Sequence, residues 1–236
     1  MSNNYYRFKQ FTIYHDQCAM KVGTDSVLLG AWVNAENCER ILDIGTGSGI
    51  IAIMMAQKYE ATIDAVEIDK KACMQAIENI QNCPWQNRIK LFQQSIQDYC
   101  KNAEIKYDHI VCNPPFFVNS LKAQDKQRNT VRHNDTLPQK DLIECSLKLL
   151  KSEGKLSLIM PYNEGSQWIA EAIKYGLFCN VKTNVKPMSH SPIKRILMEF
   201  SQIPLPCKED TLIIKSGDQS FSEKYVNLTK DFYLNF

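Results

Sequence analysis

The chain has 236 residues, of which 44% are hydrophobic and 23% are charged, and its formal net charge is +2. This balance excludes a fibrous, repetitive or disordered chain and is typical of a globular protein with one sizeable core. It also excludes a generally basic surface, so a nucleic-acid partner would have to be contacted by a local patch.

From residue 40 onward, apolar runs typical of buried strands alternate with longer segments of helical periodicity. Such alternation predicts right-handed βαβ units, and hence a mostly parallel sheet covered by helices on both faces. The strands are expected at 40–45, 61–69, 88–95, 107–115, 155–161, 179–187 and 195–200, and helices at 48–58, 70–83, 141–151 and 164–176, with Gly154 stopping the third helix.

The last two predicted strands have no helix between them, so we expect one of them to run antiparallel at an edge of the sheet. The predicted fold is therefore α/β, with a Rossmann-like sheet of seven strands. We interpret residues 1–236 as one domain, made of an N-terminal extension (1–37), a core (38–203) and a C-terminal tail (204–236).

The nine cysteines are odd in number, scattered along the chain, and never spaced as CxxC. This pattern predicts reduced, mostly buried thiols and no metal site. No apolar run is long enough to span a membrane, and the first ten residues lack the apolar segment of a signal peptide. We therefore expect a cytoplasmic protein without membrane association.

A glycine-rich loop follows the first predicted strand in "LDIGTGSGI", where Gly45, Gly47 and Gly49 come directly after Asp43. The spacing is GxGxG, tighter than the GxGxxG that holds a pyrophosphate. The second strand ends in "VEID", which puts Glu67 where a carboxylate can accept both ribose hydroxyl protons. Because Asp43 suits an ammonium group better than a pyrophosphate, the pattern favours S-adenosylmethionine over NAD. The alternative is a tight turn with an incidental acidic residue.

The fourth strand ends in a stiff turn, Asn113-Pro114-Pro115-Phe116. Since ligands bind at the carboxyl ends of parallel strands, this turn and the glycine loop are expected to face one another. The Asn113 side-chain oxygen and the Pro114 carbonyl could accept the two N–H bonds of an adenine amine, while Phe116 stacks on the base. The alternative is a strand-terminating turn with two core phenylalanines.

These motifs together resemble the class I S-adenosylmethionine-dependent methyltransferases, in which "NPPF" is the signature of enzymes that methylate amino or amide nitrogens. Two flanking segments, "FKQFTIYHDQCAMKVGTDSVLLGAW" and "YVNLTKDFYLNF", resemble the terminal motifs of the bacterial tRNA1(Val) (adenine(37)-N6)-methyltransferases. The resemblance covers nearly the whole chain. It implies methylation of N6 of adenine 37, next to the anticodon of a valine tRNA.

The resemblance also implies roles for individual residues. Many relatives place an aspartate after the third strand to contact the cofactor's adenine amine; this chain has Ser95 there, so the Ser95 hydroxyl or the Ile96 backbone would have to replace it. The catalytic residues would be Asn113, Pro114, Pro115 and Phe116, and the cofactor would be held by Lys21, Gly23, Thr24, Asp25, Asp43, Gly45, Gly47, Glu67, Ile68, Ser95, Ile96 and Asn113.

The segment 121–141 is long and polar, which predicts a mobile lid or a substrate loop. Nearby aspartates dilute its charge, so an ordinary solvated loop is an equal alternative. A monomer is favoured, although the sequence does not fix the oligomeric state. The residues expected to contact the phosphates of a tRNA are Lys122, Lys126, Arg128, Arg132 and His133.

Three other functions remain open at this stage. Ribosomal RNA guanine-N2 methyltransferases and release-factor glutamine-N5 methyltransferases also use a turn of two prolines and an aromatic residue. A non-catalytic RNA-binding protein with the same fold is a third possibility. The intact Asp43, Glu67 and Asn113 favour an enzyme over this last alternative.

Overall fold

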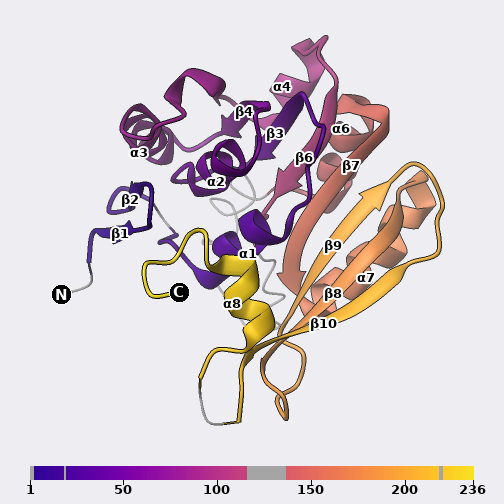
Figure 1. The fold of residues 1–236 in the computed structure, drawn as a ribbon. Coiled ribbons are helices and arrows are strands. Elements are labelled where there is room, and N and C mark those ends of the chain that lie inside the picture. The colour runs from indigo at the N-terminus through magenta and orange to yellow at the C-terminus, as the bar shows by residue number, and fades with distance from the viewer. Residues whose placement is uncertain (1–2, 19, 116–136, 218–219) are drawn as a thin grey trace, which may run out of the picture.

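A computed structural model describes residues 3–18, 20–115, 137–217 and 220–236. It contains a small antiparallel hairpin, β1 (Tyr5–Arg7) with β2 (Thr12–Tyr14), and a central sheet in the order β10-β8-β9-β7-β6-β3-β4-β5 (Figure 1). The strands of this sheet are β3 (Arg40–Ile44), β4 (Thr62–Glu67), β5 (Ile89–Gln93), β6 (Tyr107–Cys112), β7 (Leu150–Pro161), β8 (Phe178–Met188), β9 (Arg195–Ser201) and β10 (Lys208–Lys215).

Helices cover both faces of the sheet and bury one apolar cluster on each. On one face lie α1 (Thr24–Trp32), α2 (Ile50–Lys58), α3 (Lys70–Gln81) and α8 (Glu223–Thr229); on the other lie α4 (Ile96–Asn102), α6 (Gln139–Leu149) and α7 (Tyr162–Ala172). Two 3-10 turns, η1 (Gln86–Arg88) and η2 (Ile173–Tyr175), precede β5 and β8.

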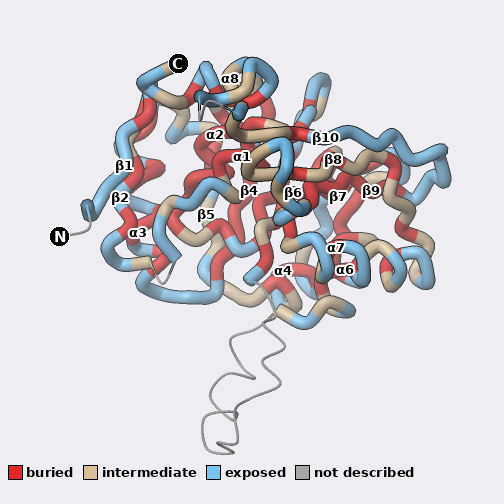
Figure 2. Tube along the Cα trace, turned by 90° about the horizontal axis from the view of Figure 1, so that it is seen from below, coloured by how far each residue is buried: buried red, intermediate tan, exposed pale blue. Residues whose placement is uncertain are grey.

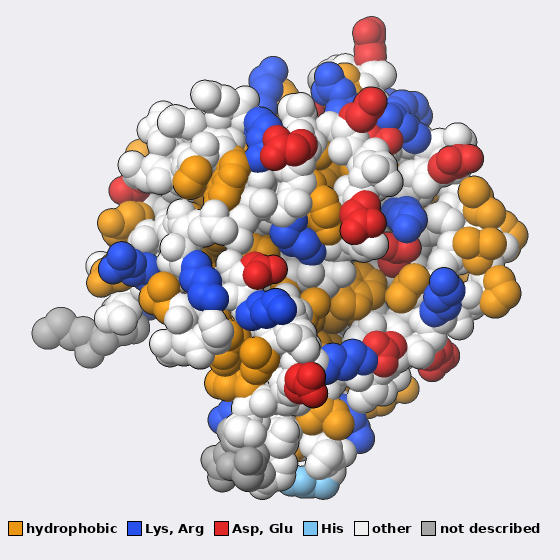
Figure 3. All heavy atoms as spheres, in the orientation of Figure 1, with side chains coloured by type: hydrophobic (Ala, Val, Ile, Leu, Met, Phe, Trp, Pro, Cys, Tyr) orange, Lys and Arg blue, Asp and Glu red, His pale blue; other side chains and the backbone are white. Residues whose placement is uncertain are grey.

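The central strands β3, β4 and β6 are buried over nearly their full length (Figure 2). Strands that are covered on both faces read as continuous apolar runs, which is why the sequence predicts them well. Around this core, acidic and basic side chains are interspersed on the face shown in Figure 3, as the near-neutral composition implies. Within the described ranges, no helix has the length and apolar character of a membrane span, and no group of metal-ligating side chains is present.

The sheet differs from the expected one in two respects. An antiparallel strand is present, as predicted, but β9 lies between β7 and β8 and not at an edge. The helical crossover from β7 to β8 leaves a gap one strand wide, and the chain turns back after β8 to fill it. The second difference is an eighth strand, β10, which extends the sheet beside β8. Its first four residues are exposed, so it lacks the apolar run that marks the others.

Helix α6 ends at Leu149, and β7 begins at the next residue. Gly154 therefore does not stop the helix, as the sequence suggested, but lies within β7 where its register against β6 shifts. A Cβ at Gly154 would lie 2.8 Å from the Tyr107 carbonyl oxygen and 3.0 Å from the Lys151 nitrogen. This glycine lets two backbones approach closely at the irregularity.

The two ends of the described chain pack together. The Lys9 backbone N–H donates to the Phe232 carbonyl at 2.8 Å, and the Lys9 ammonium donates to the Phe236 oxygen at 2.7 Å. Phe8 stacks on Tyr233 with ring centroids 6.1 Å apart and is 2% exposed. The N-terminal hairpin is thus held by the C-terminal segment.

Candidate active site

A cavity of about 680 Å³ opens at the carboxyl ends of β3, β4, β5 and β6. The glycine loop after β3 and the Asn113 turn after β6 both line it, so the structure brings together the two motifs that the sequence predicts to face one another. The predicted site residues that line the cavity are Gly45, Gly47, Glu67, Ile68, Ser95, Ile96, Asn113, Pro114 and Pro115.

The glycine loop presents its backbone to this cavity. Gly45 and Gly47 have φ values of +69° and +56°, in the left-handed region that glycine adopts without strain. A Cβ at either position would meet no atom within 4 Å, so both glycines face open space. The Gly45 N–H donates to the Val66 carbonyl, which anchors the loop to β4.

Glu67, the last residue of β4, holds the other side of this loop. Its Oε2 accepts from the Gly47 N–H at 2.9 Å, and its Oε1 accepts from the N–H groups of Ile68 at 2.8 Å and Asp69 at 2.9 Å. Each carboxylate oxygen has two lone pairs, so Oε2 can accept a further hydrogen bond from a ligand. Glu67 lines the cavity, and its contact with ribose hydroxyls stays a prediction.

Asp43 is fully buried beneath the loop and does not itself line the cavity. Its Oδ2 accepts from the Thr46 hydroxyl at 2.6 Å and from the Ala52 N–H at 3.1 Å. Its Oδ1 is buried and has no partner among the described residues. Burial raises the pKa of this carboxyl to about 7, against the lowering effect of its two hydrogen bonds.

Asn113 presents an unpaired acceptor at the cavity wall. Its Nδ2 donates to the hydroxyl of Ser26 on α1 at 3.1 Å. Its Oδ1 is buried and receives no hydrogen bond from the part of the chain that the structure describes. The amide oxygens of Gln57 and Asn184 are also buried without a donor, so it is the position of Asn113 in the cavity wall that makes its Oδ1 a candidate acceptor for a ligand N–H.

The segment at the start of α1 reaches the site differently from what we expected. Lys21, Gly23, Thr24 and Asp25 are not among the described residues that line the cavity. Asp25 accepts from the Arg195 guanidinium at 2.7 Å, which ties α1 to β9. This segment instead contributes Cys18 and Met20 to the cavity wall, and Ser26 as the acceptor for the Asn113 amide; none of the three was named in advance.

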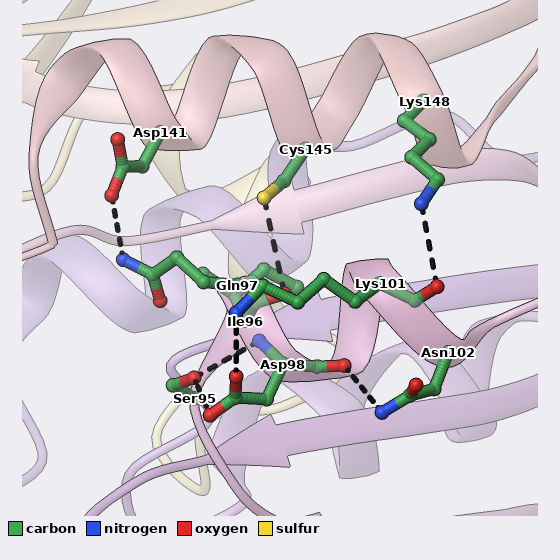
Figure 4. A network of polar contacts seen from close by, with 9 residues as sticks. All are labelled: Ser95, Ile96, Gln97, Asp98, Lys101, Asn102, Asp141, Cys145 and Lys148. Atoms are coloured by element: carbon green, nitrogen blue, oxygen red, sulfur yellow. Dashed lines mark hydrogen bonds and ion pairs between the residues drawn. The ribbon is translucent and has the colours of Figure 1, made fainter.

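Ser95 lines the cavity but its hydroxyl is already engaged. It is the N-cap of α4, where it accepts from the Asp98 N–H at 3.0 Å and donates to the Asp98 carboxylate at 2.8 Å (Figure 4). The helix that this cap starts was not predicted, because seven residues give little periodicity. Phe116, Lys122, Lys126, Arg128, Arg132 and His133 lie outside the described residues.

The cavity also has walls that the sequence analysis did not identify. Gln94 and Gln97 flank Ser95 and Ile96. Their position just after β5 could therefore have predicted that they line the cavity. Further lining residues that were not named in advance include Cys18 and Met20, in the N-terminal segment of the family resemblance, and Lys70 and Leu137.

Comparison with known proteins agrees with this geometry. The family model described as "Methyltransferase small domain" matches residues 17–180. A tRNA1(Val) (adenine(37)-N6)-methyltransferase of Parabacteroides distasonis is 46% identical over 99% of both chains, and one of Trichodesmium erythraeum is 47% identical over the full length of both. A predicted O-methyltransferase from Agrobacterium tumefaciens has the same fold, with a TM-score of 0.69 at 20% identity over 88% of this chain and 96% of its own.

The fold, the paired motifs at the strand ends and this similarity over the full length lead to one assignment. The chain belongs to the family of tRNA1(Val) (adenine(37)-N6)-methyltransferases.

Proposed function

We propose that this protein transfers the methyl group of S-adenosylmethionine to N6 of an adenine in tRNA, and that this is adenine 37 of tRNA1(Val), as in the names of its relatives. The observation that carries the proposal is the unpaired, buried Oδ1 of Asn113, which lies on the wall of a cavity shared with the glycine loop. An acceptor held there can bind the N–H of an amino group and direct its nitrogen.

The cavity residues fit S-adenosylmethionine. The volume of the cavity is in the range of small-molecule sites. Gly45 and Gly47 leave their backbone open to the methionine part, Glu67 has acceptor capacity for ribose hydroxyls, and Asp43 has an unused carboxylate oxygen for the ammonium. Bound there, the cofactor supplies an electrophilic methyl group on a sulfonium sulfur.

Asn113 and Pro114 then act on the adenine. The Asn113 Oδ1 and the Pro114 carbonyl each accept one N–H of the exocyclic amine, which draws the nitrogen toward tetrahedral geometry and aims its lone pair at the methyl carbon. S-adenosylmethionine would supply the methyl group and leave as S-adenosylhomocysteine, and the surplus proton of the amine would pass to water. Catalysis by this route rests on positioning and hydrogen bonding, and it requires no general base.

Two parts of the proposal concern the RNA. The adenine has to leave its stack to reach the cavity, and Phe116 remains the predicted stacking surface for the extruded base. The contact with tRNA phosphates stays assigned to Lys122, Lys126, Arg128, Arg132 and His133, on the basis of local charge alone.

The test is incubation of the protein with labelled S-adenosylmethionine and total tRNA that lacks this modification, followed by nucleoside mass spectrometry. The proposal predicts N6-methyladenosine in one tRNA species. The appearance of N2-methylguanosine, or of label in protein only, would instead support one of the other amino-methyltransferases.

A further inference from the structure

The side chain of Gln97 is an oriented acceptor group at the cavity. Gln97 lies in the first turn of α4 and lines the cavity next to Ser95 and Ile96. Its Nε2 donates to the carboxylate of Asp141 on α6 at 2.8 Å (Figure 4). Its Oε1 accepts no hydrogen bond from the described residues, so this oxygen is available to a ligand.

Asp141 fixes which end of the amide is available. An ionised carboxylate only accepts hydrogen bonds, so the amide must turn its NH2 group toward Asp141 and leave its oxygen on the other side. Two more contacts hold α6 beside α4 (Figure 4). The Cys145 thiol lies 3.9 Å from the Ile96 carbonyl, and the Lys148 ammonium lies 3.5 Å from the Lys101 carbonyl.

The position of Gln97 in the sheet indicates which part of the cofactor it meets. The glycine loop follows β3, Glu67 ends β4, and Gln97 follows β5, in the order in which these strands lie side by side. A cofactor whose methionine lies at the glycine loop and whose ribose lies at Glu67 therefore extends its base toward Gln97. Ile68, which is 56% exposed and lines the cavity, offers an apolar face on the way.

The neighbouring groups are less suited to accept the amine of that base. The Ser95 hydroxyl already donates to and accepts from Asp98. The Ile96 backbone N–H is a donor, which suits a ring nitrogen but not an amine. Gln94 also lines the cavity, but no hydrogen bond orients its side-chain amide within the described residues.

We infer that Gln97 accepts a hydrogen bond from the exocyclic amine of the cofactor's adenine, and that Asp141 is the positioning residue that keeps the Gln97 oxygen turned toward it. The inference rests on the proposed function. It makes the cavity selective for adenine over a 6-oxo purine, because a carbonyl at C6 would place an acceptor against the Gln97 oxygen.

The test compares the affinities for S-adenosylhomocysteine and S-inosylhomocysteine, measured by isothermal titration calorimetry. The wild type is expected to prefer the adenosyl compound by about tenfold or more, the effect of one unmatched buried hydrogen bond. Gln97→Met keeps the length of the side chain without its acceptor, and is expected to reduce this preference to about threefold or less. A preference unchanged in Gln97→Met would overturn the inference.

Asp141→Asn tests the positioning role. An asparagine can donate to the Gln97 oxygen, so the Gln97 amide can turn round and present its NH2 group to the base. The preference for S-adenosylhomocysteine over S-inosylhomocysteine should therefore become smaller. Gln97→Glu combined with Asp141→Asn should restore it, because a glutamate can only accept and the asparagine donates to it. A merely structural role of Asp141 would give no such restoration.

Two variants serve as matched controls. Glu144→Gln removes a carboxylate one turn along α6 whose partner is Lys140, and Gln94→Met alters the other glutamine of the cavity. Both should keep the wild-type preference, and a loss in Gln94→Met alone would assign the contact to Gln94 and overturn the inference. A wild type that binds neither compound would refute the proposed function as well, which separates the two failures.

Discussion

Asn113 and Asp43 each bury one side-chain oxygen without a donor in the described residues. Buried polar atoms are almost always paired, because leaving one unpaired costs about 1–3 kcal/mol. One such atom lies in the cavity wall and the other beneath the glycine loop that lines it, and the proposed function would supply both missing donors from ligands. The ammonium of the cofactor would serve Asp43, and the amine of the base would serve Asn113.

Asp43 gives a prediction about pH. Burial raises its pKa to about 7, so much of the free protein carries a neutral carboxyl below that value. A ligand ammonium favours the ionised form, so binding is linked to loss of the proton and strengthens as the pH rises. The affinity for S-adenosylhomocysteine is expected to increase about tenfold between about pH 5.5 and about pH 7.

The matched variant for this measurement is Asp43→Asn, which cannot ionise. Its affinity should be lower at the upper end of the range and nearly constant across it. An equally steep dependence in Asp43→Asn would show that another group carries the titration.

The residues of the site differ in how far the sequence predicts them. Gly45, Gly47, Glu67 and Asn113 directly follow or end predicted strands, and parallel strands bring their carboxyl ends to one edge. Ser26 could not be found in this way, because its contact with Asn113 joins positions 87 residues apart. Gln97 could not be found from the sequence either, because the residue that orients its amide, Asp141, lies on another helix.

At the scale of elements, α1 makes contacts that the family resemblance did not predict. Resemblance assigns Lys21, Gly23, Thr24 and Asp25 to the wall of the cofactor pocket. In the structure α1 links two other parts of the site and sheet, and we call it a brace for this reason. Asp25 forms an ion pair with Arg195 on β9, and the Ser26 hydroxyl accepts a hydrogen bond from the Asn113 amide. The helix thus connects the catalytic turn to the far half of the sheet.

Gly154 in β7 gives a prediction about stability. Gly154→Ala would place a Cβ 2.8 Å from the Tyr107 oxygen and 3.0 Å from the Lys151 nitrogen, and backbone atoms in a sheet cannot move aside cheaply. The free energy of unfolding, from urea denaturation, is expected to fall by about 1–3 kcal/mol.

Gly217→Ala is the matched control, since a Cβ there would meet no atom within 4 Å. It should change the free energy of unfolding by about 0.5 kcal/mol or less. A Gly154→Ala protein as stable as the wild type would contradict the close approach of β6 and β7 at this point.

The sequence predicts least well the elements whose residues show no clear alternation of apolar and polar side chains. Strand β10 is half exposed at an edge, and α4 is short, so neither gives a clear apolar pattern. The place of β9 between β7 and β8 is a matter of topology, which local pattern does not encode. The buried parallel strands β3, β4 and β6, by contrast, follow from their apolar runs.

For the whole molecule, the N-terminal hairpin packs against the C-terminal segment, which joins the two ends of the described chain. Phe8→Ala removes a ring that is 2% exposed and stacks on Phe11 and Tyr233. The free energy of unfolding should fall by about 3–5 kcal/mol. Tyr5→Ala, at a position 49% exposed on the same hairpin, should cost far less, and equal losses would argue against this packing.

The central claim is that Asn113 supplies the acceptor that directs the adenine amine. The most direct test is the single-turnover rate of N6-methyladenosine formation on tRNA1(Val) by Asn113→Ala, with cofactor affinity measured on the same protein. Ser26→Ala is the control, since it removes the brace and leaves the acceptor. We predict a rate lower by about 100-fold or more in Asn113→Ala, a smaller loss in Ser26→Ala, and cofactor affinity close to that of the wild type in both. Methyl transfer at the wild-type rate by Asn113→Ala would contradict the account.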